Sequence, residues 1–145
     1  MRAVAAGRDG TVEGQFIEES PAELIARLAG YVSPGDGAAH ARFVSQVWGE
    51  AAVAPELAAV ARATHERLEQ HLAGLLAERQ AAEYGKAEHG GKETQGDPAG
   101  EGVSDPYAAS RVALASLIGL AALVASGVPV DTASFVQEIG RLVEP

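Results

Sequence analysis

The sequence of 145 residues contains no cysteine and only two lysines, Lys86 and Lys92. The absence of cysteine excludes disulfides, thiolate metal sites and a cysteine nucleophile, and it fits a reducing cytoplasm. Acidic residues outnumber basic ones by 20 to 11, which gives a formal net charge of −9. A surface of that sign repels phosphate backbones, so these residues by themselves are not expected to bind nucleic acid.

Strand patterns and catalytic motifs are also missing. Val, Ile, Phe, Tyr and Thr never alternate with polar residues as they do in a half-buried strand. The chain has no GxSxG motif and no histidine pair at the helical spacing of metal ligands. Gly90–Thr94 has the composition but not the spacing of a phosphate-binding loop. We therefore predict neither an enzyme nor a metal or cofactor site.

Alanine dominates the apolar residues, and this favours helix. Ser20, Pro21 and Glu23 have the spacing of a capping box with proline at the first helical position. Apolar residues at helical spacing then predict an all-α fold of about five antiparallel helices, over residues 20–31, 38–52, 55–83, 105–126 and 131–143.

The predicted helices leave two segments outside them. Residues 1–19 have weak periodicity and three glycines, and we interpret them as a connecting arm before a domain over residues 20–145. Residues 84–104 contain six glycines, a proline and charges of both signs, without an apolar face. That composition predicts a flexible loop.

The fourth predicted helix has an unusual centre. Val112–Ala125 carries no charged residue and is apolar nearly all round, which is typical of a helix buried on more than one side or of a membrane span. A span needs about 20 mostly apolar residues, and Gly127 and Pro129 end this stretch too early. We therefore expect the helix to pack on its own domain and also on a second copy of the chain.

Small residues recur on that helix. Ala115, Gly119, Ala122 and Ser126 are three or four residues apart, which allows close approach of another helix. With the last helix, two helices per chain would form a four-helix bundle in a symmetric dimer. The residues expected in this interface are Ile118, Ala122, Ala125, Phe135, Ile139 and Leu142. The alternative is that the fourth helix is only an intramolecular core helix.

A second set of residues favours a small-molecule site. Bulky apolar side chains and a few polar groups occur together on the second and third predicted helices, a mixture typical of ligand pockets. The members are Phe43, Val47, Trp48, Thr64, His65 and Leu68, with Glu50 as an additional acceptor at the rim. The alternative is that Phe43 and Trp48 simply fill the core.

The order of several short motifs resembles the C-terminal half of TetR-type transcriptional regulators. The motifs cover about residues 20–143. They are Ala41-Arg42-Phe43, Trp48-Gly49-Glu50-Ala51, Pro55-Glu56-Leu57, Leu75-Leu76 followed by Gln80, Asp105-Pro106, Ile118-Gly119-Leu120 and the stop at residues 127–131.

This resemblance implies a helical regulatory domain that binds a small, usually apolar ligand and dimerises through its last two helices. Thr64 or His65 would then orient the ligand by a hydrogen bond. DNA would be bound only through a separate N-terminal helix-turn-helix domain, which these residues do not contain, and the protein would be cytoplasmic. The alternative function is a homodimeric helical interaction module without a ligand.

Overall fold

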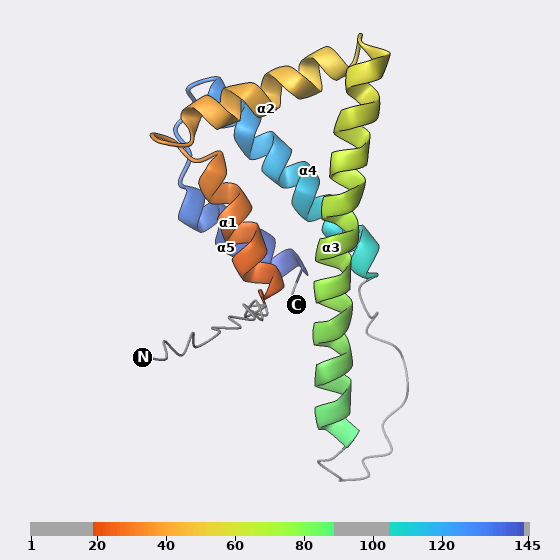
Figure 1. Ribbon diagram of the computed structural model, residues 1–145. Helices are drawn as coiled ribbons and strands as arrows, with labels where there is room; N and C mark the ends of the chain where they lie inside the picture. The colour runs from red at the N-terminus through yellow and green to blue at the C-terminus, as the bar shows by residue number, and fades with distance from the viewer. Residues whose placement is uncertain (1–18, 89–104, 144–145) are drawn as a thin grey trace, which may run out of the picture.

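The computed structural model describes residues 19–88 and 105–143, and the secondary structure in these two ranges is entirely helical (Figure 1). The helices are α1 (Pro21–Tyr31), α2 (Ala38–Ala51), α3 (Pro55–Glu88), α4 (Pro106–Ala125) and α5 (Thr132–Val143). The expected all-α class with five helices is confirmed, and most helix ends agree with the sequence-based boundaries to within one residue.

Helix α3 is longer than expected. It continues to Glu88, so Tyr84–Glu88 belong to the helix and the prediction of a loop from residue 84 is wrong for these five residues. One glycine inside a run of good helix formers costs only about 1 kcal/mol, so Gly85 does not end the helix. The rest of the predicted loop, residues 89–104, lies outside the described residues, as does the predicted arm up to residue 18.

The last residue of that predicted arm is attached to α1. Nε and Nη2 of Arg27 donate to the two carboxylate oxygens of Glu19 at 2.7 and 3.0 Å. The hydrogen bond from Arg27 is the main reason why the pKa of Glu19 lies below its usual value of 4.5. Glu19 is therefore part of the helical domain rather than of a connecting arm.

Side-chain caps fix where three helices begin. Ser20 Oγ accepts from the Glu23 N–H at 3.2 Å, and Glu23 Oε2 accepts from the Ser20 N–H at 2.7 Å, which completes the predicted capping box. The Asp105 side chain accepts a hydrogen bond from the Tyr107 N–H of α4, and the Asp131 side chain accepts hydrogen bonds from the Ala133 and Ser134 N–H groups of α5. Such caps satisfy N–H groups that have no partner within the helix. Helix α2 begins at Ala38, and its N-cap residue Gly37 provides no side-chain cap.

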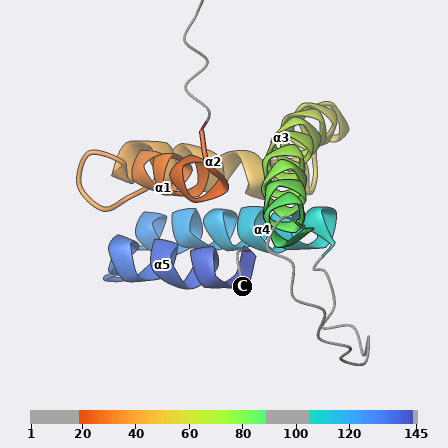
Figure 2. The same cartoon turned by 90° about the horizontal axis from the view of Figure 1, so that it is seen from below.

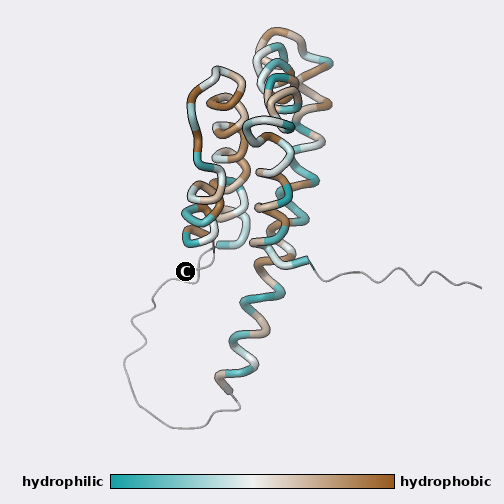
Figure 3. Tube along the Cα trace, turned by 90° about the vertical axis from the view of Figure 1, so that its left-hand side faces the viewer, coloured by the Kyte–Doolittle hydropathy of each residue, from teal (hydrophilic) through white to brown (hydrophobic). Residues whose placement is uncertain are grey.

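The helices form two layers with α4 at the centre. Figure 2 shows α1 and α2 in one layer and α4 and α5 in the other, while α3 crosses at one end. Helix α4 contacts each of the other four helices. The C-terminal part of α3 projects beyond the other helices (Figure 3). One central helix therefore holds the domain together.

Two clusters of buried side chains make the core. The first joins α1, α2 and α4 and includes Ala29, Ala41, Leu117 and Leu120. The second, which we call the closed end, joins α1, α3, α4 and α5. It consists of Leu24, Ile25, Leu72, Leu76, Ala113, Ile139 and Val143. The side chains of the closed end are at most 3% exposed, so this part of the domain is fully packed.

Helix α4 is long and apolar enough to cross a membrane by length and composition, and it is the only such helix among the described residues. Its buried residues Leu114, Leu117, Leu120 and Ala121 pack against the other helices. These contacts make α4 the helix on which the other four pack.

Residues 19–88 and 105–143 leave one face of α4 uncovered. Ala115, Gly119, Ala122 and Ser126, the small residues expected to approach another helix, are all exposed. A Cβ atom placed on Gly119 would meet nothing within 4 Å. Leu123 beside them is 42% exposed. We call this strip the small-residue face.

Candidate ligand-binding cavity

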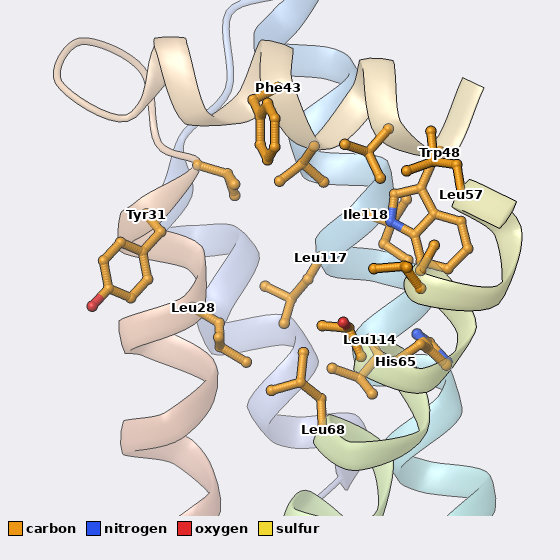
Figure 4. Close-up of a pocket in the computed structure, with 16 residues that line it drawn as sticks. Leu28, Tyr31, Phe43, Trp48, Leu57, His65, Leu68, Leu114, Leu117 and Ile118 are labelled. Carbon is orange, nitrogen blue, oxygen red and sulfur yellow. The ribbon is translucent and has the colours of Figure 1, made fainter. Parts of the chain in front are cut away.

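Helices α1, α2, α3 and α4 surround a cavity of about 430 Å³ (Figure 4). This volume lies within the usual range for small-molecule sites. We call it the apolar cavity. Its lining comprises Leu28, Tyr31, Val32, Phe43, Val44, Val47, Trp48, Leu57, Val60, Ala61, Thr64, His65, Leu68, Leu114, Leu117 and Ile118.

The structure brings together six of the seven residues that the sequence suggests as a ligand site. Those six line the apolar cavity: Phe43, Val47, Trp48, Thr64, His65 and Leu68. Glu50 does not line it. Its Oε1 atom instead accepts a hydrogen bond of 2.7 Å from Gln46 Nε2, one turn earlier on α2, and its side chain is exposed. The expectation that Glu50 adds an acceptor at the rim is therefore not met.

Aromatic side chains lie around the cavity rather than in the centre of the core. Figure 4 shows Tyr31 at one end, with its hydroxyl group directed away from the cavity, and Trp48 and His65 at the other. The rings of Trp48 and His65 meet edge to face with centroids 5.8 Å apart. Phe43 is 66% exposed. A phenylalanine that only filled the core would be buried. Phe43 therefore belongs to the rim of an open site.

The chemistry of the lining is almost uniform. Among the described residues, no Lys, Arg, Asp or Glu side chain lines the apolar cavity, and the polar groups that face it belong to Trp48, Thr64 and His65. Burying an unpaired charge in such a place is costly. The cavity therefore suits an apolar molecular body that makes one or two hydrogen bonds.

The sequence did not identify the contributions of α1 and α4. Leu28 and Tyr31 from α1, and Leu114, Leu117 and Ile118 from α4, complete the walls. Their helical spacing shows that they face inward, and no local signal separates a residue that lines a cavity from one that fills a core.

A second, more open hollow adjoins the apolar cavity, and we call it the basic hollow. The two share Trp48, Ala61, His65 and Ile118. The remaining lining of the basic hollow is four alanines and two arginines, namely Ala51, Ala52, Ala58, Ala115, Arg62 and Arg111. No acidic side chain lines it.

The residues expected in a dimer interface separate into two groups. Ile118 lines both hollows, Ile139 is 3% exposed in the closed end, and Phe135 packs against both core clusters. Ile139 is therefore buried within its own chain, whereas Ile118 and Phe135 are only half-buried there. Ala122 and Leu142 are exposed, and Ala125 is half-buried.

Within residues 19–88 and 105–143, no three His, Asp or Glu side chains lie close enough to hold a metal ion. No family model, curated protein or solved structure matches this chain.

Proposed function

We propose that this chain is the ligand-binding and dimerisation domain of a TetR-type transcriptional repressor in the cytoplasm. The observation that carries the proposal is the apolar cavity, because six residues chosen from the sequence for this role line it together. The proposed effector is a small molecule with a mainly apolar body. DNA would be bound only through a helix-turn-helix domain that these residues do not contain.

Helix α4 supports the second half of this proposal. It lines the cavity through Leu114, Leu117 and Ile118, and it carries the exposed small-residue face. A second copy of the chain packed on that face would share α4 and α5 in a four-helix bundle. An effector regulates such a dimer only by binding two of its arrangements with unequal affinity. Because α4 would belong to both the cavity and the bundle, it would couple ligand binding to the arrangement of the dimer.

The cavity is tested with a matched pair of variants and a panel of uncharged apolar compounds. Val47→Phe adds an aromatic ring inside the cavity, whereas Val53→Phe makes the same change at a residue that is 83% exposed and outside the lining. We expect compounds that raise the melting temperature of the wild type to stabilise Val53→Phe equally and to lose their effect on Val47→Phe. Equal binding by both variants would place the ligand elsewhere.

The dimer is tested by sedimentation. Ala122→Glu places a charge on the small-residue face, and Ala26→Glu places one on an exposed position of α1. Burying a carboxylate in an apolar interface is strongly unfavourable, so Ala122→Glu should be monomeric where the wild type and Ala26→Glu are dimeric. A monomeric wild type would contradict the bundle. A dimer that no compound in the panel stabilises would favour the interaction module without ligand.

A further inference from the structure

The boundary between the two hollows is made by Trp48 and His65, whose side chains line both. One side of this boundary is apolar and free of charged side chains, and the other carries two arginines. A molecule that crosses the boundary would therefore meet apolar walls at one end and guanidinium groups at the other.

The two arginines differ in their partners. Nε of Arg111 donates to Glu69 Oε1 at 2.7 Å, and this carboxylate is 12% exposed at its side chain. Arg62 is exposed and makes no ion pair or side-chain hydrogen bond within the described residues. The arginines that line the basic hollow and the carboxylate that pairs with Arg111 sum to a single positive charge. That balance suits a monoanion better than a dianion.

We propose that the apolar cavity and the basic hollow together bind one amphiphile, a monocarboxylate with an apolar alkyl or aryl body. The carboxylate lies beside Arg62 and Arg111, and the body passes Trp48 and His65 into the apolar cavity. Arginine forms strong, directional hydrogen bonds with carboxylates. The inference rests on the proposed ligand-binding function and names the chemical class of its ligand.

Charge makes this arrangement selective. The chain as a whole carries −9, so most of its surface repels an anion. In the basic hollow, two guanidinium groups adjoin the apolar cavity. A neutral analogue gains only the apolar contacts, and a short carboxylate without an apolar body gains only the headgroup contacts.

The test uses decanoate and decan-1-ol as probes, below the concentrations at which they aggregate. Trp48 is the only tryptophan and lies at the boundary, so its fluorescence reports binding directly. Hydrogen bonds to charged groups are worth enough to change affinity by about tenfold or more. We expect decanoate to bind the wild type about tenfold more tightly than decan-1-ol.

Arg62→Gln is the decisive variant, and Arg67→Gln is its control. Arg67 is exposed on the same helix, lines neither hollow and has Nε directed to the Ala63 carbonyl oxygen. Both variants remove one positive charge. We expect Arg62→Gln to weaken decanoate about tenfold and to leave decan-1-ol unchanged, and Arg67→Gln to change neither.

The outcomes separate the two proposals. If decan-1-ol and decanoate bind equally, or if Arg67→Gln weakens decanoate as much as Arg62→Gln does, the carboxylate site is wrong while the apolar cavity still functions. If neither probe binds the wild type or stabilises it against heat, the carboxylate proposal is overturned. Failure of the uncharged panel with Val47→Phe and Val53→Phe would instead overturn the ligand-binding function itself.

Discussion

The closed end and the apolar cavity draw on three of the same helices, yet one is filled and the other is hollow. Leu24 and Ile25 of α1 meet Leu72 of α3 in the closed end, and all three are at most 1% exposed. Further along the same helices, Tyr31 of α1 and Thr64 of α3 line opposite parts of a cavity and remain exposed. Residue type alone does not explain this difference.

The helix that completes each end, together with α1, α3 and α4, explains why one end is packed and the other is hollow. At the closed end, α5 packs against both α1 and α4 and supplies Ile139 and Val143. At the other end, α2 connects α1 to α3, and Figure 1 shows α1 and α3 departing from its opposite ends. The 14 residues of α2 span about 21 Å, whereas packed helices lie about 8–10 Å apart. Helix α2 therefore holds α1 and α3 too far apart to close.

The largest effect is expected from a cavity made in the closed end. Leu72 is fully buried there, so Leu72→Ala should lower the free energy of unfolding by about 2–5 kcal/mol. Urea denaturation at one fixed protein concentration measures it. Val53→Ala removes apolar atoms from a side chain that is 83% exposed and should change stability by less than about 0.5 kcal/mol. Similar losses in both variants would remove the distinction between a packed end and an open one.

An intermediate effect is expected where the chain enters α2. A Cβ atom on Gly37 would lie 2.5 Å from Ser33 N and 2.6 Å from Ser33 O, both backbone atoms. Gly37→Ala should therefore cost about 1–3 kcal/mol. A Cβ atom on Gly49, near the other end of α2, would meet nothing within 4 Å, and Gly49→Ala should stabilise by about 0.5–1 kcal/mol.

Thermal unfolding of these two glycine variants tests whether the start of α2 is under close steric constraint. If Gly37→Ala is as stable as Gly49→Ala, the backbone of the α1–α2 turn can shift at little cost in free energy. The spacing that keeps the cavity open would then not depend on that turn.

The smallest effect is expected from a pair of serine substitutions. Ser20→Ala removes the capping box beside the closed end and should cost about 1 kcal/mol. The buried Ser45 Oγ atom on α2 has no hydrogen-bond partner, so Ser45→Ala should be neutral or stabilise by up to about 0.5 kcal/mol. Both values come from chemical denaturation. A loss of stability in Ser45→Ala would show that its hydroxyl group is bonded in solution.

Local chemistry made the helix starts predictable. Ser20, Asp105 and Asp131 cap their helices through neighbours two or three residues away. The part of the cavity on α2 and α3 was also accessible from the sequence, because the two helices are joined by a short turn. Side chains near the end of α2, such as Trp48, could therefore be expected to lie close to α3.

Long-range packing decides whether an apolar helical residue lines a cavity, fills the core or faces a second copy, and the sequence pattern does not show which. Leu28 and Leu117 have the pattern of any core leucine, and only the assembled fold places them at a cavity. Ile139 lies on an apolar helix face, which shows that it is buried without showing whether its own chain or a second copy covers it. The structure places it in its own chain. The carboxylate of Glu50 accepts a hydrogen bond from Gln46, one turn away on α2, and Glu50 is not part of the cavity lining.

The central position of α4 also bears on how the chain acquires its structure during synthesis. Helices α1, α2 and α3 emerge from the ribosome before α4, yet α4 contacts all of them. Leucines such as Leu72 and Leu76 stay partly uncovered until Pro106–Ala125 has been made. Cooperative folding therefore has to wait for the second half of the chain, and until then the nascent helices expose apolar surface that chaperones recognise.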